Sequence, residues 1–314
     1  MSILVCDIGG TNTRIAQFQA GELTAFEKYP NQSHPDFYTI AALYLDKHNP
    51  TIEAVALDLA GPVANGKAQL TNIDWTITSE ALAKATKCNN VLIINDLVAM
   101  GMSLSRLPDN GLDVIRDGDP RSFDNGQSLV INLGTGFNIC PVKETPDLIA
   151  LAVEAGHAST PSDVLNLLSN HIDGARLSEF DTVEKCFAGR RLSGLYDALW
   201  NNGAKNGSEI VSAAESGDEQ AQETLRLFQA MLGLYTGSTA LNYLPQRGIY
   251  FAGSVARGVL GFENAAHFLN ALDQDRLFKE RIDVMPIKIM SLDEAPLLGC
   301  AQAAMQSFEL ESTS

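Results

Sequence analysis

Short apolar runs that stop at glycines or at polar side chains recur along the first half of the chain. Residues 3–8 form the first run, the pair Gly9 and Gly10 interrupts it, and residues 14–18 then alternate between apolar and polar side chains. This pattern predicts a buried strand, a tight turn and a second strand. Further strands are predicted at 24–29, 52–59, 91–94, 148–153 and 249–252.

Apolar residues at helical spacing lie between these runs and dominate the second half of the chain. Helices are predicted at 35–47 and at 80–86, the latter with Ser79 as its N-cap. Strands that alternate with helices favour an α/β fold whose sheet is of mixed direction. Later helices are predicted at 161–171, 190–199, 207–216, 218–242 and 295–308.

The opening pattern of strand, glycine turn and strand occurs a second time. An apolar run at 128–133 is followed by a Gly-Thr-Gly turn at 134–136 and by another apolar run at 139–142. A repeat of this kind indicates an internal duplication. The segment 106–126 is rich in Asp, Gly, Pro and Arg, so we expect a linker there, with a domain boundary at its start.

Composition narrows the classes of function. Of the 314 residues, 45% are hydrophobic and 19% are charged, which fits a buried core and about two domains. The formal net charge of −16 disfavours binding to nucleic acid or to an anionic membrane, because such a surface repels phosphate. No apolar stretch is long enough for a membrane span. Five cysteines without a CxxC pair predict reduced, buried thiols in a cytoplasmic protein.

The two glycine turns are candidate phosphate-binding loops. Without a Cβ, backbone N–H groups can point at one spot, and two such turns facing each other would grip a polyphosphate. Two plain hairpin turns are the alternative interpretation, and no Walker-type sequence is present. Asp7 precedes the first turn, where its carboxylate would hold Mg²⁺ directly or through water, or would accept hydrogen bonds from the turn.

Polar pairs that follow buried strands are the other candidates. Asn95 and Asp96 end the run at 91–94, at the edge where open α/β sheets place ligands. Asp96 is therefore a candidate general base, with a helix N-cap as the alternative role of this pair. Glu154 and His157 would hydrogen-bond a polyol; a metal site is the competing interpretation, but no zinc-like partners lie nearby.

Taken together, the motifs resemble the bacterial glucokinase family, which belongs to the sugar kinase, heat-shock ATPase and actin superfamily. The blocks that carry the resemblance follow the family's order and extend from residue 3 to about residue 305. They are Asp7-x-Gly-Gly-Thr-Asn12, Ala60-Gly-Pro-Val63 with Thr71-Asn72-x-x-Trp75, Ile93-Ile-Asn-Asp96, Gly134-Thr-Gly136 with Glu154-x-Gly-His157, and Ala252-Gly-Ser254 with Pro296-Leu-Leu-Gly299.

The resemblance implies an α/β protein with two ribonuclease-H-like domains of the actin-like ATPase kind and a cleft between them. The small domain would hold residues 1–106 and be completed by a helix at 296–314, and the large domain would hold 107–295. The resemblance further implies a homodimeric glucokinase that uses ATP and Mg²⁺ and phosphorylates glucose. Asp96 would be the base that activates the sugar 6-hydroxyl.

The resemblance also implies the remaining site residues. Composition alone would place one of them, Glu184, on a solvated helix face. The sugar would contact Asn95, Asp96, Glu154, His157 and Glu184. The nucleotide and its metal would contact Asp7, Gly9, Gly10, Thr11, Asn12, Gly134, Thr135, Gly136 and Gly253, with Asp7 as the metal ligand.

A few positions depart from the family's pattern. Ala155 adds a methyl group near the sugar, Phe137 and Asn138 follow the second turn in place of Leu-Gly, and Ser254 stands where glycine is usual. Because Asn tolerates positive φ, we expect the turn to persist. The alternatives are a kinase for mannose, fructose or an aminosugar, and a sugar-binding sensor with weak catalysis. A ROK sugar kinase is disfavoured because no cysteine cluster follows His157.

Overall fold

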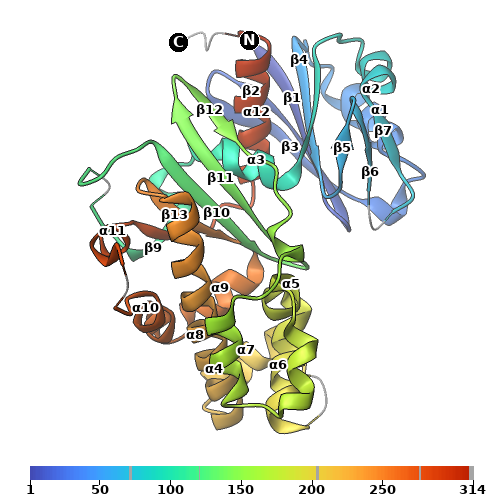
Figure 1. Cartoon of the computed structure of the whole chain (residues 1–314). Coiled ribbons are helices and arrows are strands. Elements are labelled where there is room, and N and C mark those ends of the chain that lie inside the picture. Colours follow the sequence, from blue (N-terminus) through green and yellow to red (C-terminus); the bar gives the residue numbers. More distant parts are fainter. Residues whose placement is uncertain (71–72, 120, 203–204, 276, 311–314) are drawn as a thin grey trace. The chain divides into compact units, whose positions relative to one another are not determined.

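The structure is a computed structural model of the whole chain, and it describes residues 1–70, 73–119, 121–202, 205–275 and 277–310 (Figure 1). Thr71 and Asn72, which belong to one of the sequence blocks, lie outside the described residues. The chain forms two compact units. The first comprises Met1–Asp109, Thr145–Ala152 and Leu292–Ser314, and the second comprises Asn110–Glu144 and Val153–Ser291.

The sheet of the first unit has the strand order β3-β2-β1-β4-β8. The first three strands form an antiparallel meander, and β4 and β8 continue the sheet in parallel to β1. Their bounds are β1 (Ser2–Ile8), β2 (Asn12–Gln19), β3 (Glu22–Pro30), β4 (Ala54–Leu59) and β8 (Val91–Asn95). A second, three-stranded sheet of very short strands was not predicted: β5 (Val63–Ala64), β6 (Lys67–Gln69) and β7 (Thr76–Thr78).

Helices cover both faces of the larger sheet of this unit. One hydrophobic core contains residues of α1 (Phe37–His48) and α2 (Ser79–Thr86), and a separate core on the other face contains residues of α12 (Ala295–Ser307). Helix α3 (Asp96–Ser103) packs on α12. Figure 1 shows α12, in red, alongside the blue strands.

The predicted cap of α2 is wrong by one residue. Thr78 is the N-cap, and its Oγ1 accepts a hydrogen bond from the Ala81 N–H at 3.2 Å. Ser79 is the first helical residue, because its hydroxyl instead donates to the Gly66 carbonyl at 3.2 Å.

The segment 145–152 belongs to the first unit, whereas the sequence analysis assigned it to the large domain. It contains strand β12 (Asp147–Ala150), which is shorter than the strand predicted at 148–153 and packs against α3. The side-chain amide of Gln306 in α12 accepts a hydrogen bond from the Leu148 N–H at 3.1 Å and donates to its carbonyl at 3.0 Å. Contacts of this kind join residues far apart in sequence, so no local pattern predicts them.

The second unit repeats the strand arrangement of the first. Its strands follow the order β11-β10-β13-β14-β9, with an antiparallel hairpin continued by two parallel strands. The order β2-β1-β4-β8 in the first unit has the same directions, which supports the predicted internal duplication. The bounds are β9 (Leu112–Arg116), β10 (Gln127–Leu133), β11 (Phe137–Thr145), β13 (Gly248–Ala252) and β14 (Ile287–Met290).

Strand β9 corrects the prediction of a plain linker at 106–126. It forms the edge of the sheet, paired antiparallel with β14. Edge strands tolerate charged and exposed residues, and Asp113 and Val114 are both exposed. The Asp, Gly and Pro residues around β9 are typical of a loop, so composition alone did not predict this strand.

Helices account for most of the rest of the second unit. The buried helix α8 runs through its core, and α4, α6 and α7 gather around it at the end of the unit away from the sheet (Figure 1). Helices of two turns or less, such as α5 and α11, were not predicted. The bounds are α4 (Ser162–Ser169), α5 (Val183–Phe187), α6 (Gly189–Trp200), α7 (Gly207–Glu215), α8 (Glu219–Tyr243), α9 (Ser254–Gly261), α10 (Ala266–Leu272) and α11 (Lys279–Asp283).

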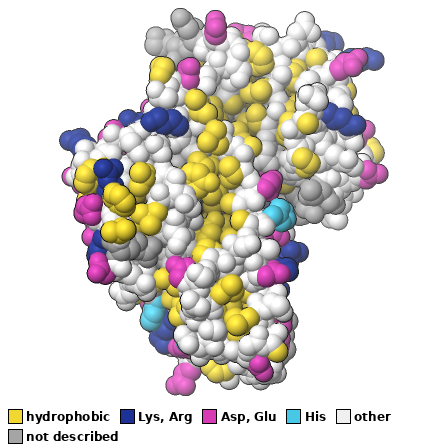
Figure 2. All heavy atoms as spheres, viewed as in Figure 1, with side chains coloured by type: hydrophobic (Ala, Val, Ile, Leu, Met, Phe, Trp, Pro, Cys, Tyr) yellow, Lys and Arg dark blue, Asp and Glu magenta, His cyan; other side chains and the backbone are white. Residues whose placement is uncertain are grey.

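Three predictions from composition concern the cysteines, membrane-spanning helices and surface charge. All five cysteines are free and buried, as predicted. None of the described helices combines the length and the apolar character that a bilayer crossing requires. Figure 2 shows Lys and Arg side chains scattered among Asp and Glu on the visible face, without a broad basic area. On this face, a phosphate ligand would have to be held by local groups.

Candidate active site

Three carboxyl groups gather where the parallel strands of the first unit end. Asp7 and Asp58 are direct neighbours in the register of β1 and β4, each one residue before the end of its strand. Asp96 follows the last residue of β8, the next strand in the sheet. The carboxyl ends of adjacent parallel strands are where open α/β sheets bind ligands.

Asp7 has one cationic partner within this cluster. Its Oδ2 lies 2.6 Å from Nη1 of Arg14, which reaches across from β2. Burial raises the pKa of Asp7, and the charge and hydrogen bond of Arg14 act in the opposite direction. Asp7 is buried, with 6% of its surface exposed.

Asp58 is a site residue that the sequence analysis missed. Its carboxyl is fully buried and accepts a hydrogen bond from the Cys300 thiol of α12 at 3.2 Å. Burial raises the pKa of Asp58 well above its usual range, and the neighbouring Asp7 raises it further. An acid inside the aliphatic run at 52–59 was the signal available in the sequence.

The structure assigns the N-cap role to Asn95 and leaves Asp96 as the candidate base. Asn95 is the N-cap of α3, and its Oδ1 accepts from the Leu97 N–H at 3.0 Å. Asp96 is the first helical residue, and its carboxylate also accepts from Leu97 N–H, at 2.9 Å. Burial raises the pKa of Asp96 to about 6, against the lowering effect of the Leu97 hydrogen bond, and Asp7 adds to the rise. A base works best when its pKa lies near the working pH.

The first glycine turn is braced from behind by a buried asparagine. The Gly9 N–H donates to the Asn12 carbonyl at 3.0 Å, and the Asn31 side-chain amide donates to the Gly9 carbonyl at 2.8 Å. The Asn31 N–H donates to the Thr11 carbonyl at 2.9 Å. Gly10 and Thr11 remain exposed at the tip of the turn. The sequence analysis did not identify Asn31, because its contacts are long-range.

In the second unit, Asn138 organises the segment that holds Glu154 and His157. Its amide nitrogen donates to the Val153 carbonyl at 2.6 Å and to Glu154 Oε2 at 3.3 Å. Its Oδ1 accepts from the Ala155 N–H at 3.0 Å. The second glycine turn persists, as expected, with the Gly134 N–H donating to the Gly136 carbonyl at 3.0 Å. It does not depend on a positive φ at Asn138, which lies within β11 at negative φ. At this position, the asparagine that departs from the family pattern links β11 through its side chain to the segment that contains Glu154.

Glu184 lies beside both of the segments that the resemblance assigns to the sugar and the phosphates. A Cβ on Gly156 would lie 3.4 Å from the Cβ of Glu184 and would overlap the Phe137 carbonyl, so Gly156 permits this close approach. A Cβ on Gly136 would lie 3.6 Å from Glu184 Oε2. Glu184, which composition alone placed on a solvated helix face, therefore borders the second glycine turn.

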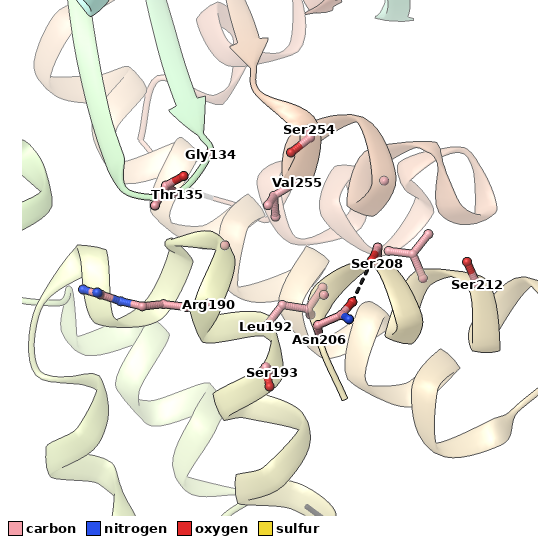
Figure 3. A pocket seen from close by; sticks show the side chains of 14 residues that line it. Gly134, Thr135, Arg190, Leu192, Ser193, Asn206, Ser208, Ser212, Ser254 and Val255 are labelled. Carbon is pink, nitrogen blue, oxygen red and sulfur yellow. Dashed lines mark hydrogen bonds between the residues drawn. The ribbon is translucent and has the colours of Figure 1, made fainter. Parts of the chain in front are cut away.

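Within the second unit, the second glycine turn opens onto a cavity of about 770 Å³ (Figure 3). This volume is within the range of small-molecule sites. Three helices begin at its wall, and two of them, α6 and α9, have no side-chain N-cap. Helix N-termini favour anions, because the positive end of the helix dipole lies there. The described lining residues are Gly134, Thr135, Gly189, Arg190, Leu192, Ser193, Asn206, Gly207, Ser208, Val211, Ser212, Ser254, Val255 and Gly258.

Two glycines allow this wall to close. Gly253 has φ +95°, and a Cβ there would overlap the Leu133 carbonyl. A Cβ on Gly189 would lie 2.5 Å from the Gly134 carbonyl oxygen, to which the Gly189 N–H donates at 2.8 Å. The ends of these strands and the starts of these helices therefore meet with backbone against backbone.

A duplicated strand arrangement, a cavity beside a glycine turn and a cluster of carboxyl groups at the strand ends are features of the class of sugar kinases and related ATPases. The Glucokinase family model matches residues 4–307. The chain belongs to the glucokinase family.

Similar proteins agree with this assignment. The chain is 25% identical to the glucokinase of Psychromonas ingrahamii over 322 residues, which cover 97% of each protein. It is 29% identical to the bifunctional protein glk of Burkholderia orbicola over 94% of this chain and 47% of that protein. The chain thus spans about half the length of the bifunctional relatives that it matches.

Solved structures confirm the predicted fold class. A glucokinase from an Antarctic psychrotroph has a TM-score of 0.84 at 24% identity and covers 97% of this chain and 99% of that chain. The ROK hexokinase of Thermus thermophilus has a TM-score of 0.71 at 20% identity and covers 98% and 99%. A ROK glucokinase of Streptomyces griseus, in complex with glucose and AMPPNP, has a TM-score of 0.65 at 19% identity and covers 98% and 100%.

Proposed function

We propose that this protein is a glucokinase, which transfers the γ-phosphate of ATP to the 6-hydroxyl of glucose. The observation that carries the proposal is Asp96, a largely buried carboxyl at the end of a parallel strand whose pKa burial raises to about 6. Family membership and the anion-accepting cavity support the same assignment.

In the proposed reaction, the sugar is held by hydrogen bonds and the proton leaves through Asp96. Asn95, Glu154, His157 and Glu184 would bond the other sugar hydroxyls. The 6-hydroxyl oxygen forms a bond to the γ-phosphorus, the bond from that phosphorus to the ADP oxygen breaks, and Asp96 accepts the hydroxyl proton. Phosphoryl transfer needs mainly positioning and charge stabilisation, which backbone N–H groups at the glycine turns would supply.

The proposed Mg²⁺ would depend on the substrate for most of its ligands. No group of three or more His, Cys, Asp or Glu side chains that fits a metal occurs among the described residues. Mg²⁺ typically takes one or two carboxylates, phosphate oxygens and water, so the single carboxylate of Asp7 fits that requirement. When bound, the ion would neutralise part of the negative charge of the phosphate groups. We also propose that the protein is a homodimer and that it is cytoplasmic. The free, buried cysteines support the cytoplasmic location.

The side chain of Ala155 packs against the hydrophobic core of the second unit, which supports glucose as the substrate despite this departure from the family pattern. A Mg²⁺–ATP assay that couples ADP release to NADH oxidation, run over glucose, mannose, fructose and glucosamine, tests the proposal. We expect the highest kcat/KM for glucose. Glucose binding by calorimetry without ADP release would identify a sensor, and a higher kcat/KM for another hexose would reassign the substrate.

The pKa of Asp96 leads to a pH prediction. A general base must be ionised, so kcat/KM for glucose is expected to be level above about pH 7 and to fall about tenfold per pH unit below about pH 6. The measurement is a pH profile from 5 to 9. Return of the pH 5 sample to pH 8 should restore activity, which separates titration from unfolding. A profile that stays level down to pH 5 would contradict Asp96 as the base.

A further inference from the structure

Arg190 lies where the nucleotide cavity meets the sugar-side carboxylate Glu184. It is the second residue of α6, whose first residue is tied to the second glycine turn by the 2.8 Å hydrogen bond from Gly189 to Gly134. The backbone of Arg190 is therefore fixed next to that turn. Among the described residues that line the cavity, Arg190 has the one charged side chain (Figure 3).

The guanidinium group of Arg190 is held only loosely. Its Nη2 lies 3.0 Å from Glu184 Oε1, and its side chain is 72% exposed. An ion pair this exposed contributes little to stability, so the guanidinium can exchange its partner readily. The same pairing occupies one oxygen of Glu184 and so competes with a sugar hydroxyl for that carboxylate.

The next residue of the helix, Arg191, has a guanidinium group that is held by contacts within the protein. Its Nε donates to the Lys185 carbonyl at 2.6 Å, its Nη2 donates to the Glu179 carbonyl at 2.8 Å, and its guanidinium stacks on the Phe180 ring at 5.0 Å. These contacts fix Arg191 within the protein and away from the cavity lining. Arg190 has the same charge at the adjacent position but belongs to the cavity lining, which makes the two residues a matched pair.

We propose that Arg190 binds the distal phosphates of the nucleotide and, in doing so, releases Glu184 to the sugar. This inference rests on the proposed kinase function. A chain of net charge −16 needs a local cation for a polyphosphate, and a guanidinium makes charge-assisted, often bidentate bonds with phosphate oxygens. Because the Arg190–Glu184 pair must break for both ligands, each ligand raises the affinity for the other, as linkage requires.

The test is calorimetric titration of AMP, ADP and AMPPNP, each with Mg²⁺, into the whole protein and its variants. In Arg190→Gln we expect a loss of about 10- to 100-fold for ADP or AMPPNP, as for a bond to a charged group, and less than about twofold for AMP. Arg190→Lys should recover part of the loss. The control is Arg191→Gln, which removes the same charge and should keep the ratio of AMP to AMPPNP affinity.

Glucose titrations with and without AMPPNP test the coupling. In the wild type, AMPPNP should tighten glucose binding, and in Arg190→Gln glucose should bind the free protein more tightly while the tightening by AMPPNP shrinks. Equal AMP, ADP and AMPPNP affinities in Arg190→Gln and the wild type would overturn the inference, as would an equal loss for all three nucleotides. Wild-type protein that shows the expected nucleotide affinities but phosphorylates no hexose would refute the kinase function and leave the phosphate contact intact.

Discussion

Replacement of Asp96 by asparagine is expected to lower kcat for glucose by about 10²- to 10⁴-fold, the range of general-base catalysis. The asparagine Oδ1 can still accept the Leu97 N–H that now bonds the carboxylate at 2.9 Å, so the start of α3 should keep its structure. The amide cannot accept the hydroxyl proton at neutral pH. The measurements are kcat by the coupled assay and the glucose dissociation constant by calorimetry, which should change little. A variant with near-normal kcat would exclude Asp96 as the base.

The same substitution is expected to stabilise the protein at pH 8. Burial raises the folded-state pKa of Asp96 from the ordinary 3.8 to about 6, so the folded state holds an ionised carboxylate at an unfavourable position above pH 6. The stabilisation that the neutral acid provides is complete below pH 4 and is lost as the pH rises through 6. A shift of this size corresponds to about 3 kcal/mol as an upper estimate.

Urea denaturation at pH 4 and pH 8 measures this effect. The free energy of unfolding of Asp96→Asn should exceed that of the wild type by about 1–3 kcal/mol at pH 8 and match it at pH 4. Asp74→Asn, which changes an exposed carboxylate of the same unit, is the control and should show no such gain. Activity lost together with stability gained is the expected pattern at a site where function requires a strained charge.

The sheet could be predicted from the sequence because its strands are apolar runs with clear ends. The runs at 3–8, 52–59 and 91–94 each stop at glycine or a polar pair, and each corresponds to a strand. Strand β9 was missed because an edge strand needs no apolar run. The helices α5 and α11 are too short to show a 3.6-residue period.

The candidate site could be predicted only where a residue sits in a local motif. Asp96 and the two glycine turns follow strands directly, so sequence position alone indicates the sheet edge. The partnership of Asp7 with Asp58 depends on the register of two strands, and the contacts of Asn138 and Arg190 depend on chain segments that only folding brings together. Asn138 and Arg190 contact the predicted residues Glu154 and Glu184 through their side chains. Residue spacing along the sequence does not predict such contacts.

The second large effect is expected from Gly299→Ala in α12. A Cβ at Gly299 would overlap the Ala99 carbonyl oxygen of α3 and lie 3.1 Å from the Ala99 Cα, so the two helix backbones touch. Neither backbone can move aside as a flexible side chain can, and forced overpacking destabilises by about 3 kcal/mol or more at such a contact. Displacement of α12 would also move the Cys300 thiol away from the Asp58 carboxyl, 3.2 Å from it in the structure.

The control for this variant is Gly194→Ala, also within a helix. The nearest atom to a Cβ at Gly194 is the Arg191 Cζ at 3.4 Å, an ordinary van der Waals distance, so the gain in helix propensity should leave stability equal or raise it by about 0.5–1 kcal/mol. Thermal and urea unfolding compare the two variants with the wild type. Because α12 closes one face of the sheet that ends at Asp7, Asp58 and Asp96, Gly299→Ala should reduce activity as well as stability. Equal unfolding midpoints for Gly299→Ala and the wild type would contradict the packing of α12 on α3.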